Sequence, residues 1–303
     1  MLTRRVHKNL VWLDIASPTQ AEVRSVMREY DVHPLVIDEL LTPSVRQKTE
    51  RYGDFLYLVL HFPALSGRHE HVAQEIDFII GKRLLVTTRY EEIEPLRSFA
   101  KTFDTAATLE GEALQSHGGH ILYLMVRTLY RALADEIEFV REELHHIEDR
   151  VFAGEEQKMV FEISHISRVI LDFRRTLAPH EEILSSLDTA GGRLFGQEFS
   201  FYARLLQGEF LKVQSGLDEL RDSLQELRET NNSLVSTKQN EIMKNLTIMA
   251  FVTFPLVLVS SMFSMNARYM PIVGAPGDFW IILGIMSVLA LFFFIYFKTK
   301  RWL

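Results

Sequence analysis

Residues 246–263 of this chain read LTIMAFVTFPLVLVSSMF, and residues 279–297 read FWIILGIMSVLALFFFIYF. Neither stretch contains a charged side chain. Each is long enough to cross the roughly 30 Å hydrocarbon core of a bilayer as a helix, which takes about 20 residues. A more polar turn, residues 264–278, joins the two stretches. The chain is therefore predicted to be a soluble body carried on a two-helix membrane hairpin.

Basic residues predict the orientation of this hairpin. Those that flank its outer ends are Lys238, Lys244, Lys298, Lys300 and Arg301, whereas the turn carries only Arg268. Because basic residues accumulate on the cytoplasmic side, both termini are predicted to be cytoplasmic and the turn to lie outside. We expect a multi-pass protein of the inner or plasma membrane.

Composition excludes several classes of protein. The chain has 303 residues, no cysteine and a formal net charge of −7. It therefore has no disulfide, thiolate metal site or cysteine nucleophile, and its acidity argues against a nucleic-acid partner. The sequence also lacks the glycine-rich phosphate loop, the His-Glu-X-X-His pair and the Gly-X-Ser-X-Gly elbow. We expect neither an enzyme nor an ATP-driven pump, and no cofactor.

Residues 1–115 are predicted to form a cytoplasmic α/β domain. Strand-forming residues occupy 10–15, 55–62, 72–80 and 83–88, with Gly81-Lys82 as a hairpin turn. Helices are expected at 21–30, 34–41 and 92–103, the first of them started by Ser17-Pro18-Thr19-Gln20. The fold class that follows is α+β for this part of the chain.

Residues 116–244 are predicted to be a long-helix, coiled-coil or stalk region, and residues 245–303 the transmembrane hairpin. Apolar residues recur every three or four positions, with breaks expected at Gly154, Pro179 and Gly191-Gly192. A heptad seam follows, formed by Leu206, Phe210, Val213, Leu217, Leu220, Leu224, Leu227 and Leu234, with Asn231 as its polar member. A helix from 197 to 263 would be about 100 Å long. Asn231 is consistent with an oligomer, because a single polar residue on a coiled-coil seam fixes the register of the helices and the number of chains that associate.

One helical stripe on the first span mixes polar, small and apolar residues. Its members are Asn240, Met243, Thr247, Ala250, Phe254, Val257, Ser261 and Ser264. The second span is almost uniformly apolar, so the first is the better candidate to line a pore. Two helices cannot enclose water alone, so conduction requires an oligomer. The alternative is that the small residues only allow close helix packing.

Several motifs resemble the CorA/ZntB superfamily of divalent-cation transporters. They are STKQNEIMK at 236–244, LTI at 246–248, Pro255, Ser264-Met265-Asn266, Met270-Pro271, YFKTKRWL at 296–303 and, near the N-terminus, His33-Pro34-Leu35 and LVL at 58–60. The resemblance implies a funnel-shaped homopentamer in which the first span lines one central pore. It implies transport of a divalent cation, with Mg²⁺ or Zn²⁺ as cargo and Co²⁺ or Ni²⁺ as further candidates.

The same resemblance assigns roles to pore residues. Asn266 would form a ring of amide oxygens at the outer mouth, in the tripeptide Ser264-Met265-Asn266, and Asn240 a second ring near the cytoplasmic end beside Met243. Leu246 and Phe254 would supply apolar constrictions. The chemistry is sensible because Mg²⁺ dehydrates reluctantly, so neutral carbonyls can hold a hydrated ion through its waters without binding it too tightly for release.

The sequence departs from the family pattern in four places. Ser264 replaces the usual glycine, which would cost on the order of 1 kcal/mol if the position requires a positive φ. Phe254 replaces an expected methionine. The turn has Asp278 as its only carboxylate, which leaves proton coupling open. Residues 202–206 read YARLL, without the acidic residues of a metal sensor. These departures leave Mg²⁺ and Zn²⁺ equally supported.

Two further interpretations stay open. Histidines at 69, 71, 117, 120, 145 and 146 are most simply solvated, although His-X-His in a loop can bind Zn²⁺ weakly. The rival to a transporter is a non-conducting, membrane-anchored coiled-coil scaffold or sensor. The chain's expected partners are further copies of itself, the lipid bilayer and divalent cations.

Overall fold

A computed structural model describes residues 1–63, 73–108, 118–265, 271–274, 276–300 and 302. The chain divides into two compact units, Met1–Arg228 and Glu229–Leu303. Helix α7 (Gln197–Phe263) begins in the first unit and ends in the second.

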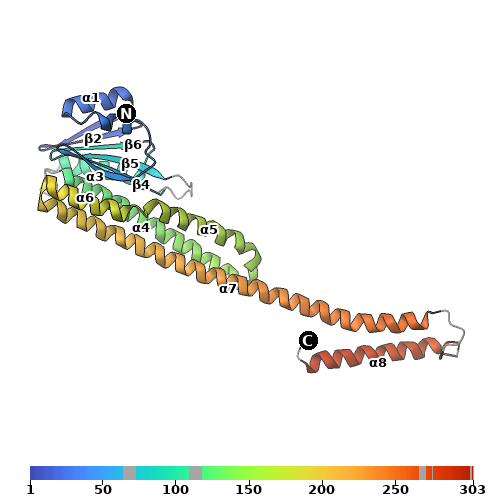
Figure 1. Ribbon diagram of the computed structural model, residues 1–303. Helices are drawn as coiled ribbons and strands as arrows, with labels where there is room; N and C mark the ends of the chain where they lie inside the picture. The colour runs from blue at the N-terminus through green and yellow to red at the C-terminus, as the bar shows by residue number, and fades with distance from the viewer. Residues whose placement is uncertain (64–72, 109–117, 266–270, 275, 301, 303) are drawn as a thin grey trace. The chain divides into compact units, whose positions relative to one another are not determined.

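The first unit contains a six-stranded mixed sheet (Figure 1). In spatial order its strands are β1 (Leu2–His7), β2 (Leu10–Ala16), β6 (Leu84–Arg89), β5 (Gln74–Ile80), β4 (Phe55–Phe62) and β3 (Lys48–Tyr52). Strands β2 and β6 are parallel and all other neighbours are antiparallel. The predicted strands are confirmed, including the hairpin between β5 and β6. Sequence patterning missed β1 and β3, which are rich in charged and polar residues.

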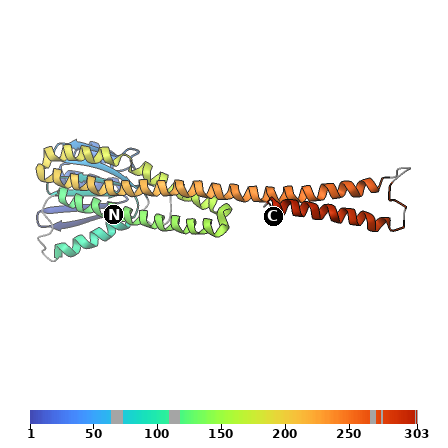
Figure 2. The same ribbon diagram turned by 90° about the horizontal axis from the view of Figure 1, so that it is seen from below.

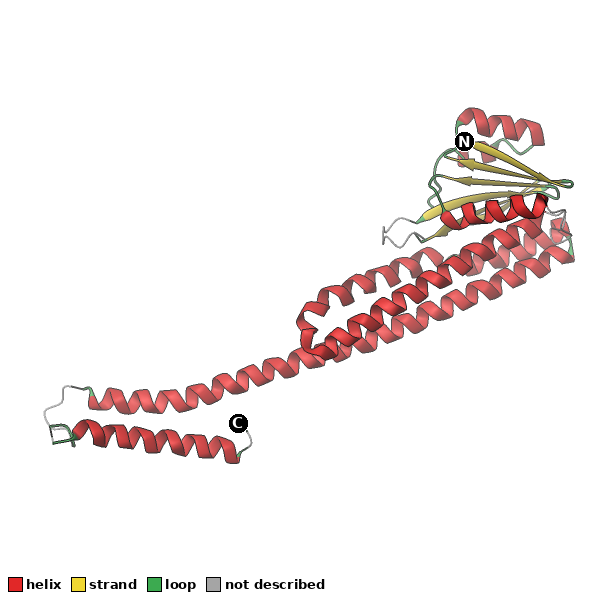
Figure 3. Cartoon of the chain, turned by 180° about the vertical axis from the view of Figure 1, so that it is seen from behind, coloured by secondary structure: helices red, strands yellow, loops and turns green. Residues whose placement is uncertain are grey.

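Helices cover both faces of this sheet (Figure 3). On one face, Leu13, Ile15, Tyr57, Ile79 and Val86 pack against α1 (Gln20–Tyr30) and α2 (Leu35–Glu39). On the other face lie α3 (Glu94–Thr108), α4 (Gly118–Arg150), α5 (Glu156–Leu177) and α6 (His180–Phe195). The unit is therefore a three-layer arrangement, because strand side chains alternate between two buried faces.

The start of α1 follows the predicted capping signal. Glu22 donates its backbone N–H to Thr19 Oγ1 at 3.4 Å, and the Glu22 carboxylate accepts the backbone N–H of Thr19 at 3.1 Å. This reciprocal capping box satisfies donors that the first helical turn leaves unpaired. The helix ends at Asp31, whose φ of 55° places it in the left-handed region.

Two of the three predicted helix breaks are confirmed, and the third is wrong. Gly154 has a φ of 92° in the short π-helical segment Val151–Glu155 that joins α4 to α5, and Pro179 precedes α6. Helix α6 instead continues through Gly191-Gly192 and ends at Gly196, where φ is 94°. A Cβ at Gly191 would overlap the Phe199 ring, so this glycine allows close packing rather than a break.

The heptad seam of α7 packs inside the first unit. Its apolar side chains from Leu206 to Leu227 are all at most 6% exposed. Ion pairs join α7 to its neighbours: Arg127 of α4 lies 3.5 Å from Glu209, and Arg174 of α5 lies 3.6 Å from Asp218. Figure 2 shows α4, α5 and α7 side by side. From Leu206 to Leu227 the seam therefore packs against other helices of the same chain and not against a second copy. The role of Asn231 in an oligomer stays a prediction.

His180 connects the sheet to the helical layer. Its ring is fully buried, with Nδ1 2.8 Å from Tyr130 Oη and Nε2 2.9 Å from the carbonyl oxygen of His61. The ring also packs edge-on against Phe62. Burial lowers the pKa of His180 from 6.5 to about 4, so this histidine is neutral at physiological pH.

A buried acidic pair lies on the sheet face covered by α1 and α2. Asp77 is 0% exposed and accepts a hydrogen bond from Tyr90 Oη at 3.4 Å. Glu75, two residues earlier, accepts the Ser44 backbone N–H and lies 3.2 Å from His61 Nε2. Burial first, and then the charge and hydrogen bond of Glu75, raise the pKa of Asp77 well above its usual value.

We predict that Asp77→Asn stabilises the protein, and more so as pH rises. The native state holds a proton on Asp77 that the unfolded chain releases above about pH 4, so the wild-type stability falls as pH rises from there through the raised native pKa. Asparagine keeps a donor for Glu75 and does not titrate. Thermal unfolding of the full chain in detergent should show a gain at pH 8 that shrinks toward pH 4, each 1 kcal/mol being worth about 2–4 °C. An equal effect at both pH values would contradict the raised pKa of Asp77 in the folded protein.

The second unit contains the end of α7, a turn, and α8 (Asp278–Thr299). Figure 3 shows the end of α7 and α8 running alongside each other. Both α7 and α8 contain segments that are long and apolar enough to cross a membrane. Pro255 lies inside α7 without ending it. The predicted spans therefore fall within observed helices. The domain boundaries at residues 115 and 244 stay predictions.

Candidate functional site

The α7 stripe predicted from the sequence is open to its surroundings. We keep the name "α7 stripe" for Asn240, Met243, Thr247, Ala250, Phe254, Val257, Ser261 and Ser264. Thr247 and Ala250 are partly exposed and the other six are exposed. Phe254 is 71% exposed and Val257 is 57% exposed. The described part of a single chain therefore leaves most of the stripe uncovered.

A different face of the same helix is covered. Ile248 is only 8% exposed, and Val252, Leu256, Val259 and Phe263 are partly exposed, whereas six of the eight stripe residues are exposed. The other helix of this unit is α8, and residues of α7 and α8 line one cavity, so we infer that α8 covers this face. Phe254 and Val259 are five residues apart, which separates them by about 140° around the helix axis. The packing of α8 thus leaves the stripe facing away.

Two hydroxyl groups on the stripe, those of Thr247 and Ser264, donate hydrogen bonds within their own helix. Thr247 Oγ1 donates to the Met243 carbonyl oxygen at 2.7 Å, and Ser264 Oγ donates to the Ser260 carbonyl oxygen at 2.9 Å. Such bonds let a hydroxyl lie at membrane depth at small cost. The hydroxyl oxygens keep lone pairs that can accept hydrogen bonds from an ion's hydration water.

Ser264 occupies the glycine position of the family motif without strain. Its backbone N–H donates to the carbonyl oxygens of Ser260 at 3.1 Å and Ser261 at 3.2 Å, which continues the helix. Its φ is not positive, so the cost of about 1 kcal/mol considered from the sequence does not arise. Met265 follows and is exposed. Asn266, the predicted mouth residue, lies outside the described residues.

Asp278, the acidic residue of the turn, holds the start of α8. Its carboxylate accepts the backbone N–H of Gly274 at 3.0 Å and of Phe279 at 2.7 Å. A carboxylate at a helix N-terminus is stabilised by the orphan N–H groups there. This contact gives Asp278 a structural role in the turn.

In the part of the chain that the structure describes, the other candidate residues from the sequence, which are Asn240, Leu246 and the histidines, do not form one cluster. Asn240 and Leu246 are exposed on α7, although Leu246 is eight residues before Phe254 and so about 80° away around the axis. Among the described residues, no three or more His, Asp or Glu side chains are placed to hold a metal ion. His120 packs against Tyr123 and Tyr202, and His145 lies 3.4 Å from Glu148. The histidines at 69, 71 and 117 lie outside the described residues.

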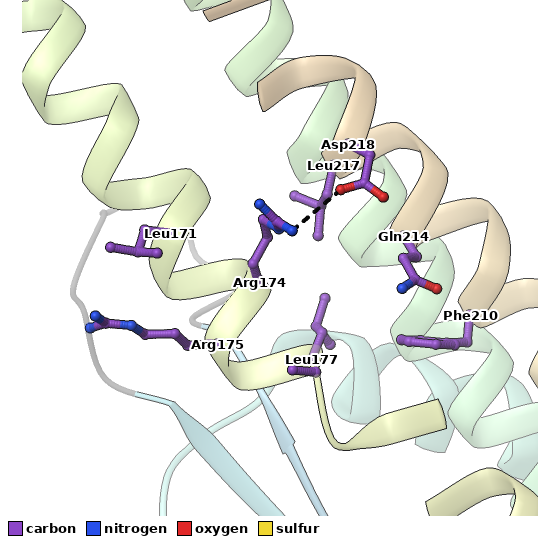
Figure 4. Close-up of a pocket in the computed structure, with 9 residues that line it drawn as sticks. Leu171, Arg174, Arg175, Leu177, Phe210, Gln214, Leu217 and Asp218 are labelled. Carbon is purple, nitrogen blue, oxygen red and sulfur yellow. Dashed lines mark ion pairs between the residues drawn. The ribbon is translucent and has the colours of Figure 1, made fainter. Parts of the chain in front are cut away.

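A cavity of about 290 Å³ in the first unit lies between α5 and α7 (Figure 4). Among its lining residues Asp218 is the only acid, and it already pairs with Arg174 at 3.6 Å. Arg175 adds a second cation to the lining. A divalent cation would be repelled here, so this cavity is not a cargo site.

A second cavity, of about 580 Å³, lies in the second unit. It is lined by Phe251 of α7, by Phe293, Tyr296 and Phe297 of α8, and by Lys300 and Trp302. Sequence analysis assigned no site to these residues. The available signal was the cluster of aromatic residues and lysines at the end of the second span.

Comparisons with known proteins agree with this architecture. The family model described as CorA-like Mg2+ transporter protein matches residues 7–301. The cobalt/magnesium transport protein CorA of Thermotoga maritima is 26% identical over 294 residues, covering 96% of this chain and 83% of the relative.

Solved structures agree as well. The CorA magnesium transporter from Methanocaldococcus jannaschii superposes with a TM-score of 0.84 at 20% identity, covering 97% of this chain and 92% of the other. The ZntB cytoplasmic domain from Vibrio parahaemolyticus superposes with a TM-score of 0.63 at 10% identity, covering 76% of this chain and 89% of the other. These likenesses show a shared fold.

The family match covers nearly the whole chain, from the sheet to the end of α8, and the family consists of transporters rather than enzymes. The chain belongs to the CorA-like Mg²⁺ transporter family.

Proposed function

We propose that several copies of this chain assemble in the inner or plasma membrane as a divalent-cation transporter whose path is lined by the α7 stripe. The observation that carries the proposal is the exposure of that stripe on the face of α7 that α8 leaves uncovered. A ring of such helices would turn the polar and small side chains toward a common axis. Five copies is the number that the family resemblance implies.

Positions along the stripe suggest a sequence of steps. A hydrated cation would meet the Asn266 amides at the mouth, pass Ser264 and Ser261, and then reach the apolar ring of Phe254. Asn240 would provide the last polar ring before the cytoplasm. Neutral oxygens suit an ion that keeps its water shell, and an apolar ring gates by dewetting.

The electrochemical gradient is a sufficient driving force. A membrane potential of 100 mV is worth about 2.3 kcal/mol per charge, and about twice that for a divalent ion. Positive-inside placement of the lysines that flank the spans would put both termini in the cytoplasm, so the potential would drive inward movement.

Mg²⁺ is the first candidate for cargo, with Co²⁺ next. Support comes from the family match and from the name of the Thermotoga maritima relative, a cobalt/magnesium transport protein. Zn²⁺ has weaker support, since the ZntB likeness is one of fold at 10% identity.

Uptake into proteoliposomes tests the proposal. Purified protein should carry Mg²⁺ into vesicles loaded with an ion-sensitive dye, faster when the interior is negative. Parallel assays with Co²⁺, Ni²⁺ and Zn²⁺, with and without a proton gradient, identify the cargo and its coupling. If none of the four ions enters, the non-conducting scaffold is the better account.

A further inference from the structure

One wall of the cavity at the end of α8 is aromatic, and it is formed where the chain that follows the helix places Trp302 against Phe297. Lys300 donates its backbone N–H to the Tyr296 carbonyl oxygen at 3.1 Å, and Trp302 donates its own to Phe297 at 3.0 Å. These bonds turn the chain back, so that the Trp302 ring stacks on Phe297 with centroids 5.9 Å apart and planes 25° apart. Phe297 is 4% exposed as a result. The wall is thus ordered by specific contacts.

The opposite wall comes from α7 and the preceding turns of α8. Phe251, 58% exposed, faces the cavity together with Phe293 and Tyr296. Phe251 lies three residues before Phe254, about 60° from it around α7, so this cavity is beside the α7 stripe rather than on it. Its volume of about 580 Å³ is within the range of small-molecule sites.

The charge of this region is positive. Lys300 lines the cavity, and among the described residues it makes no ion pair. After Glu241 the sequence contains one acidic residue, Asp278, which holds the opposite end of α8. Lys298 lies two residues before Lys300. An apolar cavity lined by an ammonium group that has no ion-pair partner in the described part of the chain selects a ligand that has an apolar body and an anionic head.

We propose that this cavity binds an anionic phospholipid of the cytoplasmic leaflet, with its phosphate on Lys300 and its acyl chain against Phe251 and Phe293. Tyr296 and Trp302 are the residue types that favour the headgroup level of a bilayer, and basic pockets between membrane helices on the cytoplasmic side bind such headgroups. The inference rests on the membrane placement in the proposed function.

Native mass spectrometry of the full chain tests the site. Purified protein is titrated with short-chain phosphatidylglycerol and, separately, with phosphatidylcholine of the same chains. We expect phosphatidylglycerol to bind more tightly, and Lys300→Gln to weaken it about fivefold, the effect of one lysine at an anionic surface. Lys298→Gln is the matched control and should change binding little. Trp302→Ala should weaken binding while leaving both lysines in place.

Any of four results would overturn the site. Three of them are equal binding of the two lipids, undiminished binding to Lys300→Gln, and equal losses in Lys300→Gln and Lys298→Gln, which would mean diffuse charge attraction. An assembled protein that excludes both lipids would mean that a second copy covers the cavity, which also overturns it. Uptake measured on the same preparations separates the two claims. Selective lipid binding without uptake refutes only transport, and uptake without selective binding refutes only the lipid site.

Discussion

Asn266→Ala should lower the initial rate of Mg²⁺ uptake by at least about tenfold, because a hydrogen bond to a charged group is worth about 1.5–3 kcal/mol and 1.4 kcal/mol is a factor of ten. In the proposed assembly the substitution would remove an amide oxygen from every copy at the mouth, so the loss would be repeated around the ring. A hydrated ion would then meet the methyl groups of alanine instead of acceptors for its water.

Asn245→Ala is the matched control for this experiment. It removes the same group from an exposed position on α7, but residue 245 is nine residues before Phe254 and so about 180° from it around the axis. Its uptake should stay near that of the wild type. Full activity of Asn266→Ala, or equal losses in the two variants, would refute the assignment of the mouth.

Phe254→Ala should raise the rate of divalent-cation uptake severalfold. Phe254 is the largest apolar side chain on the α7 stripe, and in the proposed assembly its copies would form an apolar constriction, which blocks ions by expelling water. Alanine would widen this constriction and let water remain. The stiff aromatic ring, where the family pattern has a flexible methionine, makes the expected change larger.

Phe292→Ala provides the comparison, since Phe292 of α8 is 60% exposed and Phe254 is 71% exposed. Both variants lose the same side chain from an exposed helical position in a predicted span. Only the change at Phe254 should alter uptake. If both variants increase the leak of ions, general loosening of the helices explains the result and Phe254 is no gate.

Sequence patterning predicted most of the fold for identifiable reasons. Strand β4 and the capped start of α1 at residues 17–20 were predicted because burial on two faces and helix capping leave local signals in the sequence. Strands β1 and β3 were missed because edge strands carry polar residues that resemble loops. The helix break predicted at Gly191-Gly192 was wrong, because a glycine that allows a close helix contact looks the same in the sequence as one that ends a helix.

The candidate site was predictable in part. Helical periodicity alone grouped the α7 stripe, and the structure adds that α8 packs on another face. The heptad seam could not reveal its partner, since spacing is the same whether a helix packs on its own chain or on a copy; here its side chains are buried within one chain. For the cavity at the end of α8, the sequence offered only a cluster of aromatic residues and lysines, because the cavity depends on the backbone turning after α8 to place Trp302 on Phe297.

The most direct test of the central claim is the accessibility of Val257 to water in the assembled protein. The chain has no cysteine, so Val257→Cys and its control Val288→Cys each create a single thiol. The two valines are 57% and 69% exposed in one chain and lie in different spans. A charged, membrane-impermeant thiol reagent applied to proteoliposomes should label Val257→Cys and block its cation uptake, and should leave Val288→Cys unlabelled. If Val257→Cys is as unreactive as Val288→Cys, the α7 stripe faces lipid or protein, and no water-filled path runs along it.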